Sequence, residues 1–347
     1  MSEVWSVKAD DIKESTVRLL KLTGFEPPAG SRVLIKPNLV EPRPPSTGVT
    51  AHPEIVAGII EYLRALANYD IVLGEGSSAF LKNSVDTFKV CGYEPLLARY
   101  GVPFLDLKHQ PSVKKRIDGR TVEIAKPALE ADVVVSVPVL KVHQNTTLTL
   151  GLKNMKGCVT DGEKNRFHTI DLDQAIVDVN RFLKVGLCVM DAVVGIRKGT
   201  CVSGEPLNLG MILAGMDVVA VDAVSAALVG LEPGSIRHIA LAERCGLGVA
   251  ELGRIEFHGT GSRKRATAEP LSLAKFEGVR DAGACSACAA ALVVALEKLR
   301  AVPKVPILVG PHKDGEGLLV GKCPRGRGKR VPGCPPKALD ILKGLKG

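Results

Sequence analysis

Between residues 31 and 260, short apolar runs alternate with segments that carry apolar residues at helical spacing. The runs are rich in Val, Ile and Leu, and several are apolar on both faces, as in a sheet covered by helices on both sides. We expect strands within residues 32–38, 69–78, 102–107, 131–141, 185–195, 210–215 and 254–259. We expect helices within residues 52–67, 171–184, 220–231 and 234–246. This alternation predicts an α/β fold with a largely parallel sheet.

The chain divides into two parts. Residues 1–260 form the predicted α/β core, and residues 261–347 form a small C-terminal module that holds four cysteines. The stretch "FHGTGSRKRATAEPLS" between them mixes Gly, Ser, Thr, Pro and basic residues, which is typical of a linker. Within the module we expect helices at residues 286–301 and 335–346, and no internal repeat is evident.

Positive charge is concentrated in the module. The formal net charge of the chain is +9. From residue 261 onward there are 17 Lys and Arg against 7 Asp and Glu, whereas the first 260 residues hold 29 against 30. The basic surplus therefore belongs to the segment with the four cysteines, and it favours an acidic partner or ligand there.

The four cysteines are spaced like the ligands of a metal site: Cys285, Cys288, Cys323 and Cys334. Four thiolates hold either a structural zinc ion or an iron–sulfur cluster, and spacing alone does not separate the two. The remaining cysteines stand singly in the core and are expected to be buried free thiols: Cys91, Cys158, Cys188, Cys201 and Cys245.

Three details favour one 4Fe–4S cluster over zinc. Cys323 and Cys334 are each followed by proline, as in bacterial ferredoxin motifs. The second cysteine pair is not the tight knuckle of zinc ribbons. Basic residues surround the ligands and would stabilise an anionic cluster. In addition, "VPGCPPKALDILKGL" resembles the Gly-Cys-Pro-Pro segment in small subunits of hydrogenases, in which that cysteine is a cluster ligand.

A second set of polar residues follows the predicted strands directly. Ligands of open parallel sheets bind beyond the carboxyl ends of the strands, so these side chains are expected to converge on one crevice. The candidates for binding an anionic small molecule are Lys36, Asn38, Glu75, Ser77, Lys153 and Asp191. The candidates for catalysis are His143, His168 and Lys141, because imidazole titrates near neutrality and lysine attracts anions.

Several of these stretches resemble the domain of unknown function 362 family over roughly residues 30–245. The stretches are "VLIKPNLV", "IVLGEGSS", "PVLKVHQNTTLTLGLKNMKGCV" and "VMDAVVG". Members are commonly described as iron–sulfur cluster-binding or ferredoxin-like proteins. The resemblance places the family's recurrent polar positions at Lys36, Glu75, Lys141, His143, Lys153, His168 and Asp191.

Together these features favour an iron–sulfur protein of the cytoplasm, possessing neither a secretory signal nor an apolar run of the roughly 18 residues that cross a membrane. Electron transfer or reduction would be coupled to an anionic small molecule in the core. The basic module would dock an acidic carrier such as a ferredoxin or flavodoxin.

Two alternatives remain open. The first is a zinc-stabilised nucleic-acid-binding protein, which is disfavoured because Phe276 is the sole aromatic residue of the module. The second is a non-redox protein that handles a metal or cofactor and has a structural or sensory cluster. Its second metal would be bound by His143, His168 and Asp191, with Cys158 or Cys201.

Overall fold

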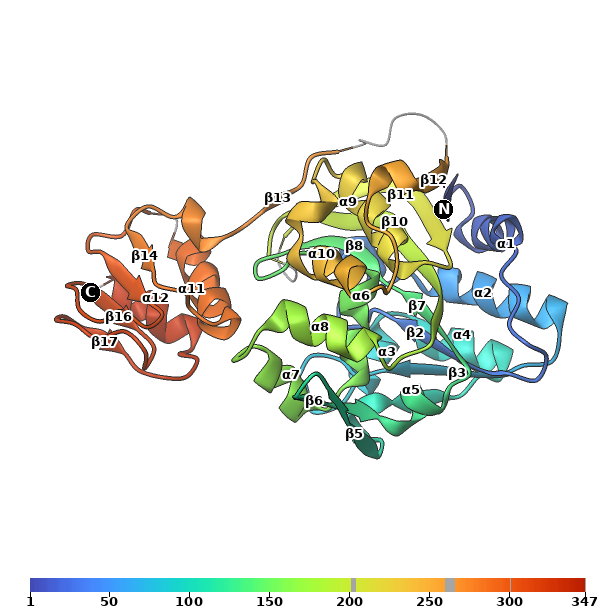
Figure 1. Ribbon diagram of the computed structural model, residues 1–347, viewed down its shortest axis with the longest axis horizontal. Helices are drawn as coiled ribbons and strands as arrows, with labels where there is room; N and C mark the ends of the chain where they lie inside the picture. Colours follow the sequence, from blue (N-terminus) through green and yellow to red (C-terminus); the bar gives the residue numbers. More distant parts are fainter. Residues whose placement is uncertain (201–203, 260–265, 300, 347) are drawn as a thin grey trace.

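The computed structural model describes residues 1–200, 204–259, 266–299 and 301–346. Figure 1 shows a large α/β core and a smaller C-terminal part, which are joined by an extended segment around strand β13. Within the described residues, no helix has both the length and the apolar character needed to cross a membrane.

The core is built on a mixed sheet with eleven strands in the described residues. Its main path runs β12 (Ile255–His258), β1 (Ser2–Lys8), β11 (Glu205–Gly215), β10 (Val185–Gly199), β7 (Val133–Val137), β2 (Arg32–Pro37), β3 (Asp70–Glu75) and β4 (Phe104–Asp106). Strands β10, β7, β2, β3 and β4 are parallel, whereas β11 is antiparallel to both of its neighbours. Off this path lie β8 (Val139–His143), β9 (Thr147–Thr149) and β13 (Glu269–Pro270).

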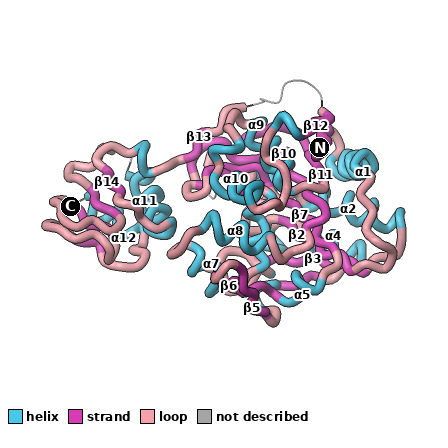
Figure 2. The backbone as a smooth tube through the Cα atoms, viewed as in Figure 1, coloured by secondary structure: helices cyan, strands magenta, loops and turns pink. Residues whose placement is uncertain are grey.

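Helices cover both faces of this sheet and create two apolar cores (Figure 2). One core receives α1 (Ile12–Thr23), α2 (Pro53–Leu66), α3 (Val85–Val90) and α4 (Tyr93–Tyr100). The other receives α5 (Lys126–Glu130), α6 (Gly151–Asn154), α7 (Asp161–Phe167), α8 (Leu172–Asn180), α9 (Val218–Leu228) and α10 (Arg237–Arg244). The hairpin of β5 (Ser112–Ile117) and β6 (Arg120–Ala125) packs on the second core.

The predicted α/β class, with a largely parallel sheet between helices, is confirmed. Each expected strand region contains a strand, and Pro138 divides the region 131–141 into β7 and β8. The four expected core helices are present as α2, α8, α9 and α10. The sequence pattern missed β1, α1 and the β5–β6 hairpin. The first two begin before the alternation, and the hairpin is rich in charged residues.

The C-terminal part has its own small parallel sheet. Strands β14 (Val279–Asp281), β15 (Ile307–Val309), β16 (Leu318–Val320) and β17 (Arg330–Val331) pair in chain order. Helices α11 (Ser286–Leu299) and α12 (Ala338–Lys346) supply Leu292, Leu296 and Ile341 to a third apolar core. The linker predicted at residues 257–272 falls partly outside the described residues.

The expectation of no internal repeat is wrong for this sheet. Val309 pairs with Val320 and Val320 with Val331, so the chain returns to the same position every 11 residues. The glycines repeat with it: a Cβ on Gly328 would lie 2.1 Å from the carbonyl oxygen of Gly317, which explains glycine at this crowded contact. Three residues beyond the paired valines, the repeat places His312, Cys323 and Cys334 at equivalent positions.

Candidate functional site

Lys36, at the end of β2, lies fully buried beside Glu75, at the end of β3. Its ammonium group donates to Glu75 Oε2 at 2.8 Å, to Asn154 Oδ1 at 2.9 Å and to the carbonyl oxygen of Pro37 at 2.9 Å. Glu75 also accepts from the backbone N–H of Leu39 at 2.8 Å. Both charges are therefore satisfied inside the protein, as a buried ion pair requires.

Asn154 connects this pair to a second buried lysine. Its Oδ1 accepts from Asn38 Nδ2 at 3.2 Å, and Asn38 Oδ1 accepts from Lys141 Nζ at 2.6 Å. Lys141 also donates to the carbonyl oxygen of Val49. The predicted residues Lys36, Asn38 and Glu75, at the carboxyl ends of β2 and β3, thus come together with Lys141, in the middle of β8, in a closed polar network.

The "LGLKNMKG" stretch brings Asn154 into this network. Asp222, on α9, accepts from the backbone N–H groups of Gly151 at 2.6 Å and Leu152 at 2.9 Å, and so holds the start of α6. Gly157 allows the close approach that follows: a Cβ there would lie 2.1 Å from Glu75 Oε1. The sequence reasoning did not select Asp222, although an aspartate in an apolar helix is a usable signal.

The raised pKa of Asp222 predicts that the stability of the folded protein depends on pH. Burial raises this pKa to about 7 from the usual value near 3.8, so folding favours the protonated acid. Its stabilising contribution is fully present below about pH 3.8 and is lost as the pH rises through 7. Relative to Asp222→Asn, the wild type should therefore lose stability between pH 4 and pH 8, as measured by urea unfolding. A pH-independent difference between the two proteins would contradict this expectation.

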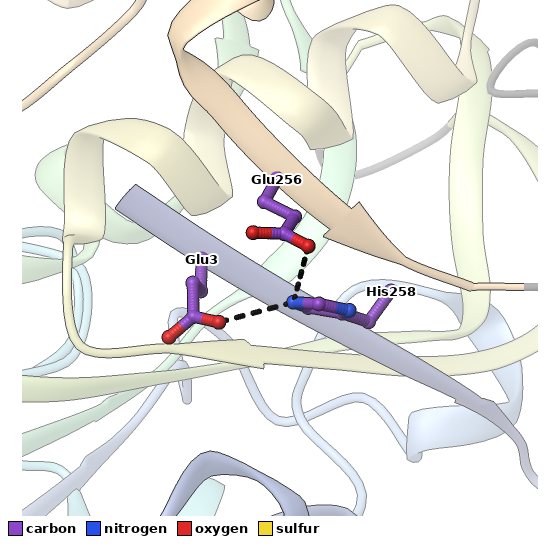
Figure 3. A group of neighbouring side chains, drawn as sticks. All are labelled: Glu3, Glu256 and His258. Carbon is purple, nitrogen blue, oxygen red and sulfur yellow. Dashed lines mark hydrogen bonds and ion pairs between the residues drawn. The ribbon is translucent and has the colours of Figure 1, made fainter. Parts of the chain in front are cut away.

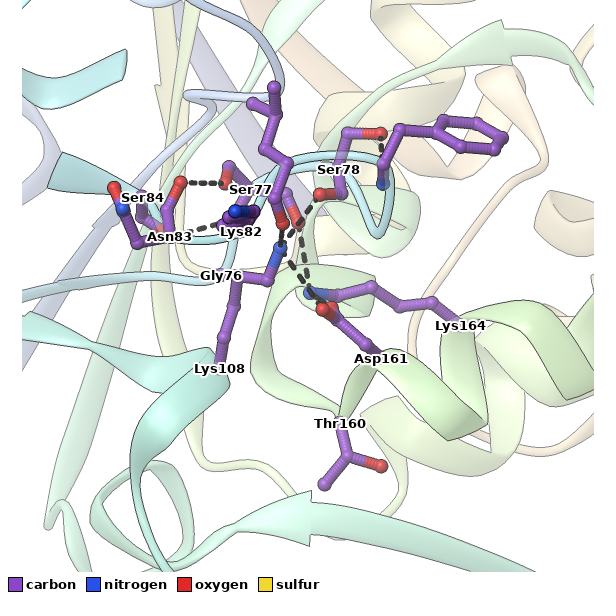
Figure 4. A network of polar contacts seen from close by, with 12 residues as sticks. Gly76, Ser77, Ser78, Lys82, Asn83, Ser84, Lys108, Thr160, Asp161 and Lys164 are labelled. Atoms are coloured by element: carbon purple, nitrogen blue, oxygen red, sulfur yellow. Dashed lines mark hydrogen bonds and ion pairs between the residues drawn. The ribbon is translucent and has the colours of Figure 1, made fainter. Parts of the chain in front are cut away.

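Asp191 and Ser77 hold backbone segments near the network. Asp191 accepts from the backbone N–H of His52 at 2.7 Å, which fixes the start of α2, and burial raises its pKa to about 6. Ser77 lies in the loop after β3, and its carbonyl oxygen accepts from Lys164 Nζ at 2.9 Å (Figure 4). Lys108 donates to the same loop and pairs with Asp161 at 3.0 Å.

His168 is separated from the closed network and faces the C-terminal part. Its Nδ1 lies 2.9 Å from Ser286 Oγ, and its Nε2 lies 2.7 Å from Lys156 Nζ. The Ser286 hydroxyl also donates to the carbonyl oxygen of His168 at 3.2 Å. Since the lysine ammonium donates to Nε2, Nδ1 carries the proton and donates to Ser286, which corresponds to a neutral imidazole.

His143 lies close to His168, and both imidazoles are held neutral. Burial, followed by Lys156 and Lys153, lowers the pKa of His168 to about 3. Burial and then Lys153 lower the pKa of His143 well below its usual range. Of the two, His168 touches the C-terminal part directly. Lys153 is half-buried at the end of α6 and lowers the pKa of both histidines.

The four terminal cysteines lie on neighbouring segments of the C-terminal part. Cys285 follows β14, Cys288 lies in the first turn of α11, and Cys323 and Cys334 follow β16 and β17. The pKa of the Cys288 thiol is raised to about 12, first by burial and then by Cys285, with smaller contributions from Cys334 and Cys323. The other three thiols are therefore all near enough to Cys288 to act on it electrostatically.

Among the described residues, one group of three or more His, Cys, Asp or Glu side chains has its potential ligand atoms within 4.8 Å of one another. It lies at the edge of the main sheet and consists of Glu3, Glu256 and His258 (Figure 3). These side chains are exposed or half-buried, and His258 stacks on Trp5 with ring centroids 4.8 Å apart. Of the residues considered for a second metal, Cys158 is buried, with its pKa raised by burial to about 12, and Cys201 lies outside the described residues.

The model of the family named domain of unknown function (DUF362) matches residues 33–227, more than half of the chain. The chain therefore belongs to the DUF362 family, as the resemblance implied. The match contains the whole network from Lys36 to Asp222 and ends before the C-terminal cysteines.

A thylakoid-associated protein of Synechocystis sp. is 28% identical over 228 residues, which cover 63% of this chain and 69% of that protein. Two solved structures are also similar. The lactate racemase apoprotein from Thermoanaerobacterium thermosaccharolyticum has a TM-score of 0.39 and 16% identity, with coverage of 62% of this chain and 54% of that one. A protein from Thermotoga maritima has a TM-score of 0.42 and 11% identity, with 69% and 60% covered. The chain thus spans little more than half the length of both structures.

Proposed function

We propose that this protein binds one 4Fe–4S cluster through Cys285, Cys288, Cys323 and Cys334. The cluster would serve electron transfer or reduction coupled to an anionic small molecule bound by the core. The observation that carries the proposal is that Cys285, Cys323 and Cys334 all lie near enough to Cys288 to raise its pKa. Four thiolates are the usual ligands of such a cluster, which would supply one-electron chemistry.

The electrostatics of the site fit an anionic group. Cys288 lies at the positive end of the α11 dipole. The Arg330 guanidinium donates to the carbonyl oxygens of Gly321 at 2.8 Å and Pro324 at 2.7 Å, next to the Cys323 turn. Four further basic side chains are exposed and form no ion pair within the described residues: Lys322, Arg325, Arg327 and Lys329. They offer a docking surface for an acidic carrier such as a ferredoxin or flavodoxin.

In the core, the residues that would bind the anionic small molecule lie at the contact with the C-terminal part. His168 touches Ser286, which lies between Cys285 and Cys288 in the chain. The lysines beside it, Lys153 and Lys156, would attract an anion. With their pKa values lowered, His143 and His168 would act as neutral hydrogen-bonding groups near neutral pH, not as cations.

Metal analysis tests the proposal directly. Protein purified without oxygen should contain about four irons and four sulfides per chain, with broad absorbance near 400 nm that bleaches with dithionite. One zinc per chain without colour would overturn the redox assignment and favour a structural module. Salt-dependent binding to an oligonucleotide in that colourless protein would then support the nucleic-acid alternative.

A further inference from the structure

A cleft of about 310 Å³ lies between the turn that joins β8 to β9 and the start of α11. It brings together two segments that are far apart in the sequence, next to the contact between His168 and Ser286. Its lining residues are Gln144, Asn145, Ser272, Leu273, Ala274, Asp281, Ala284, Ser286 and Ala289. No cysteine lines it among the described residues, although Ala284 and Ser286 stand on either side of Cys285 in the chain.

The amide groups on the core side of the cleft have no partner. Both polar atoms of the Asn145 side chain, and Oε1 of Gln144, are buried without a hydrogen bond to any described residue. A buried polar atom left unpaired carries the full penalty of its desolvation, so native structures rarely keep one without a reason. A bound molecule that pairs with these amides would supply that reason.

The turn that presents these amides is strained. Thr147, two residues after Asn145, has a φ of 65°, which is unfavourable for a β-branched residue. The backbone N–H of Asn145 donates to His143 Nδ1 at 3.1 Å, and this hydrogen bond fixes the start of the turn. Strain of this kind gathers at ligand sites, where the fold holds a loop in one shape.

The charge of the cleft selects against anions. Asp281 is the one ionisable side chain among its described lining residues, and it is a carboxylate. It accepts from the backbone N–H groups of Gly283 at 3.0 Å and Ala284 at 2.7 Å. An anionic ligand would be repelled by Asp281, and the unpaired amide groups of Asn145 and Gln144 offer hydrogen bonds to a neutral group.

We propose that this cleft binds a neutral, planar small molecule carrying a hydrogen-bond donor and acceptor side by side, as a carboxamide or a lactam does. The Asn145 amide would pair with both groups, and Gln144 Oε1 would accept a further hydrogen bond. Leu273, Ala274 and Ala289 would contact the flat faces of this planar molecule. This inference goes beyond the proposed function and does not require the cluster.

Nicotinamide and its acid, nicotinate, form a matched pair of probes that differ in the amide alone. Binding to the full chain is measured by saturation-transfer NMR and calorimetry. At a moderate ligand efficiency, nicotinamide should bind with a Kd of about 1 mM or tighter. Nicotinate should bind at least about tenfold more weakly, because it lacks the donor and carries a negative charge. Absence of nicotinamide binding, or equal binding of the two, overturns the proposal.

Asn145→Leu removes the amide and retains a side chain of similar size. It should weaken nicotinamide binding about tenfold or more. Its melting temperature should stay the same or rise, because an unpaired buried amide is removed. The control is Asn165→Leu, on the exposed side of α7, which should bind normally. Unchanged binding of nicotinamide by Asn145→Leu would contradict the proposal. Iron and sulfide content, measured in the same samples, tests the cluster separately.

Discussion

Serine in place of Cys334 is expected to remove the absorbance near 400 nm and to lower the iron content from about four per chain to nearly none. Serine has nearly the size of cysteine, but its hydroxyl stays protonated at neutral pH and does not replace a thiolate ligand. Because Cys334 is exposed and follows the short strand β17, the substitution removes little packing. Iron and sulfide analysis with the absorption spectrum measures the effect.

The matched control is Cys245→Ser. Cys245 is an exposed free thiol at the end of α10, so the expectation that it is buried is wrong. This variant should keep the colour and metal content of the wild type. The ligand assignment fails if Cys334→Ser keeps its iron, or if both variants lose it equally.

Alanine in place of Glu75 is expected to lower the free energy of unfolding by about 3–5 kcal/mol, because it leaves a buried ammonium without its counter-charge. Lys36 is fully buried and keeps Asn154 and Pro37 as partners, neither of which carries charge. The backbone N–H of Leu39 also loses its acceptor. Urea unfolding near pH 7 measures the change.

Two variants separate charge from packing in this prediction. The double variant Lys36→Met/Glu75→Leu removes both charges and should recover much of the loss, because apolar replacements of a buried pair are often tolerated. Glu130→Ala breaks an exposed pair, whose atoms lie 3.3 Å apart, and should change stability by less than about 1 kcal/mol. A loss for Glu75→Ala no larger than that of Glu130→Ala would mean that Lys36 finds another way to be solvated.

The strand-end network was accessible from sequence because parallel strands carry their carboxyl ends to one edge of a sheet. Lys36, Glu75 and Lys141 each follow an apolar run, so the rule that places the strands also places the side chains. The sequence did not predict that the polar groups of this network would be paired with one another inside the protein. That depends on Asn154, the last residue of α6, and on Gly157, in the short 3-10 helix that follows, which approach side chains of the distant strands β2 and β3.

His168 shows a different limit. Its place after "RF" at the end of a short helix carries no pattern that points to Ser286, 118 residues further on. The contact arises from how the C-terminal part lies against the core, which no periodicity encodes. The 11-residue repeat was hidden for another reason: its strands are three residues or fewer, and its consistent marks are glycines and a valine. Aligning "GEGLLVGKCP" with "GRGKRVPGCP" would have revealed it.

The 11-residue return of the chain also acts as a ruler. Neighbouring strands of a sheet lie about 4.8 Å apart, so residues at the same place in successive turns begin from nearly the same separation. Cys323 and Cys334 differ by one such turn. The number of residues between the two cysteines is therefore constrained as strictly as the identity of the cysteines. A single inserted residue there would turn one thiol away from the other, whereas the surface loops of the core should accept the same insertion readily.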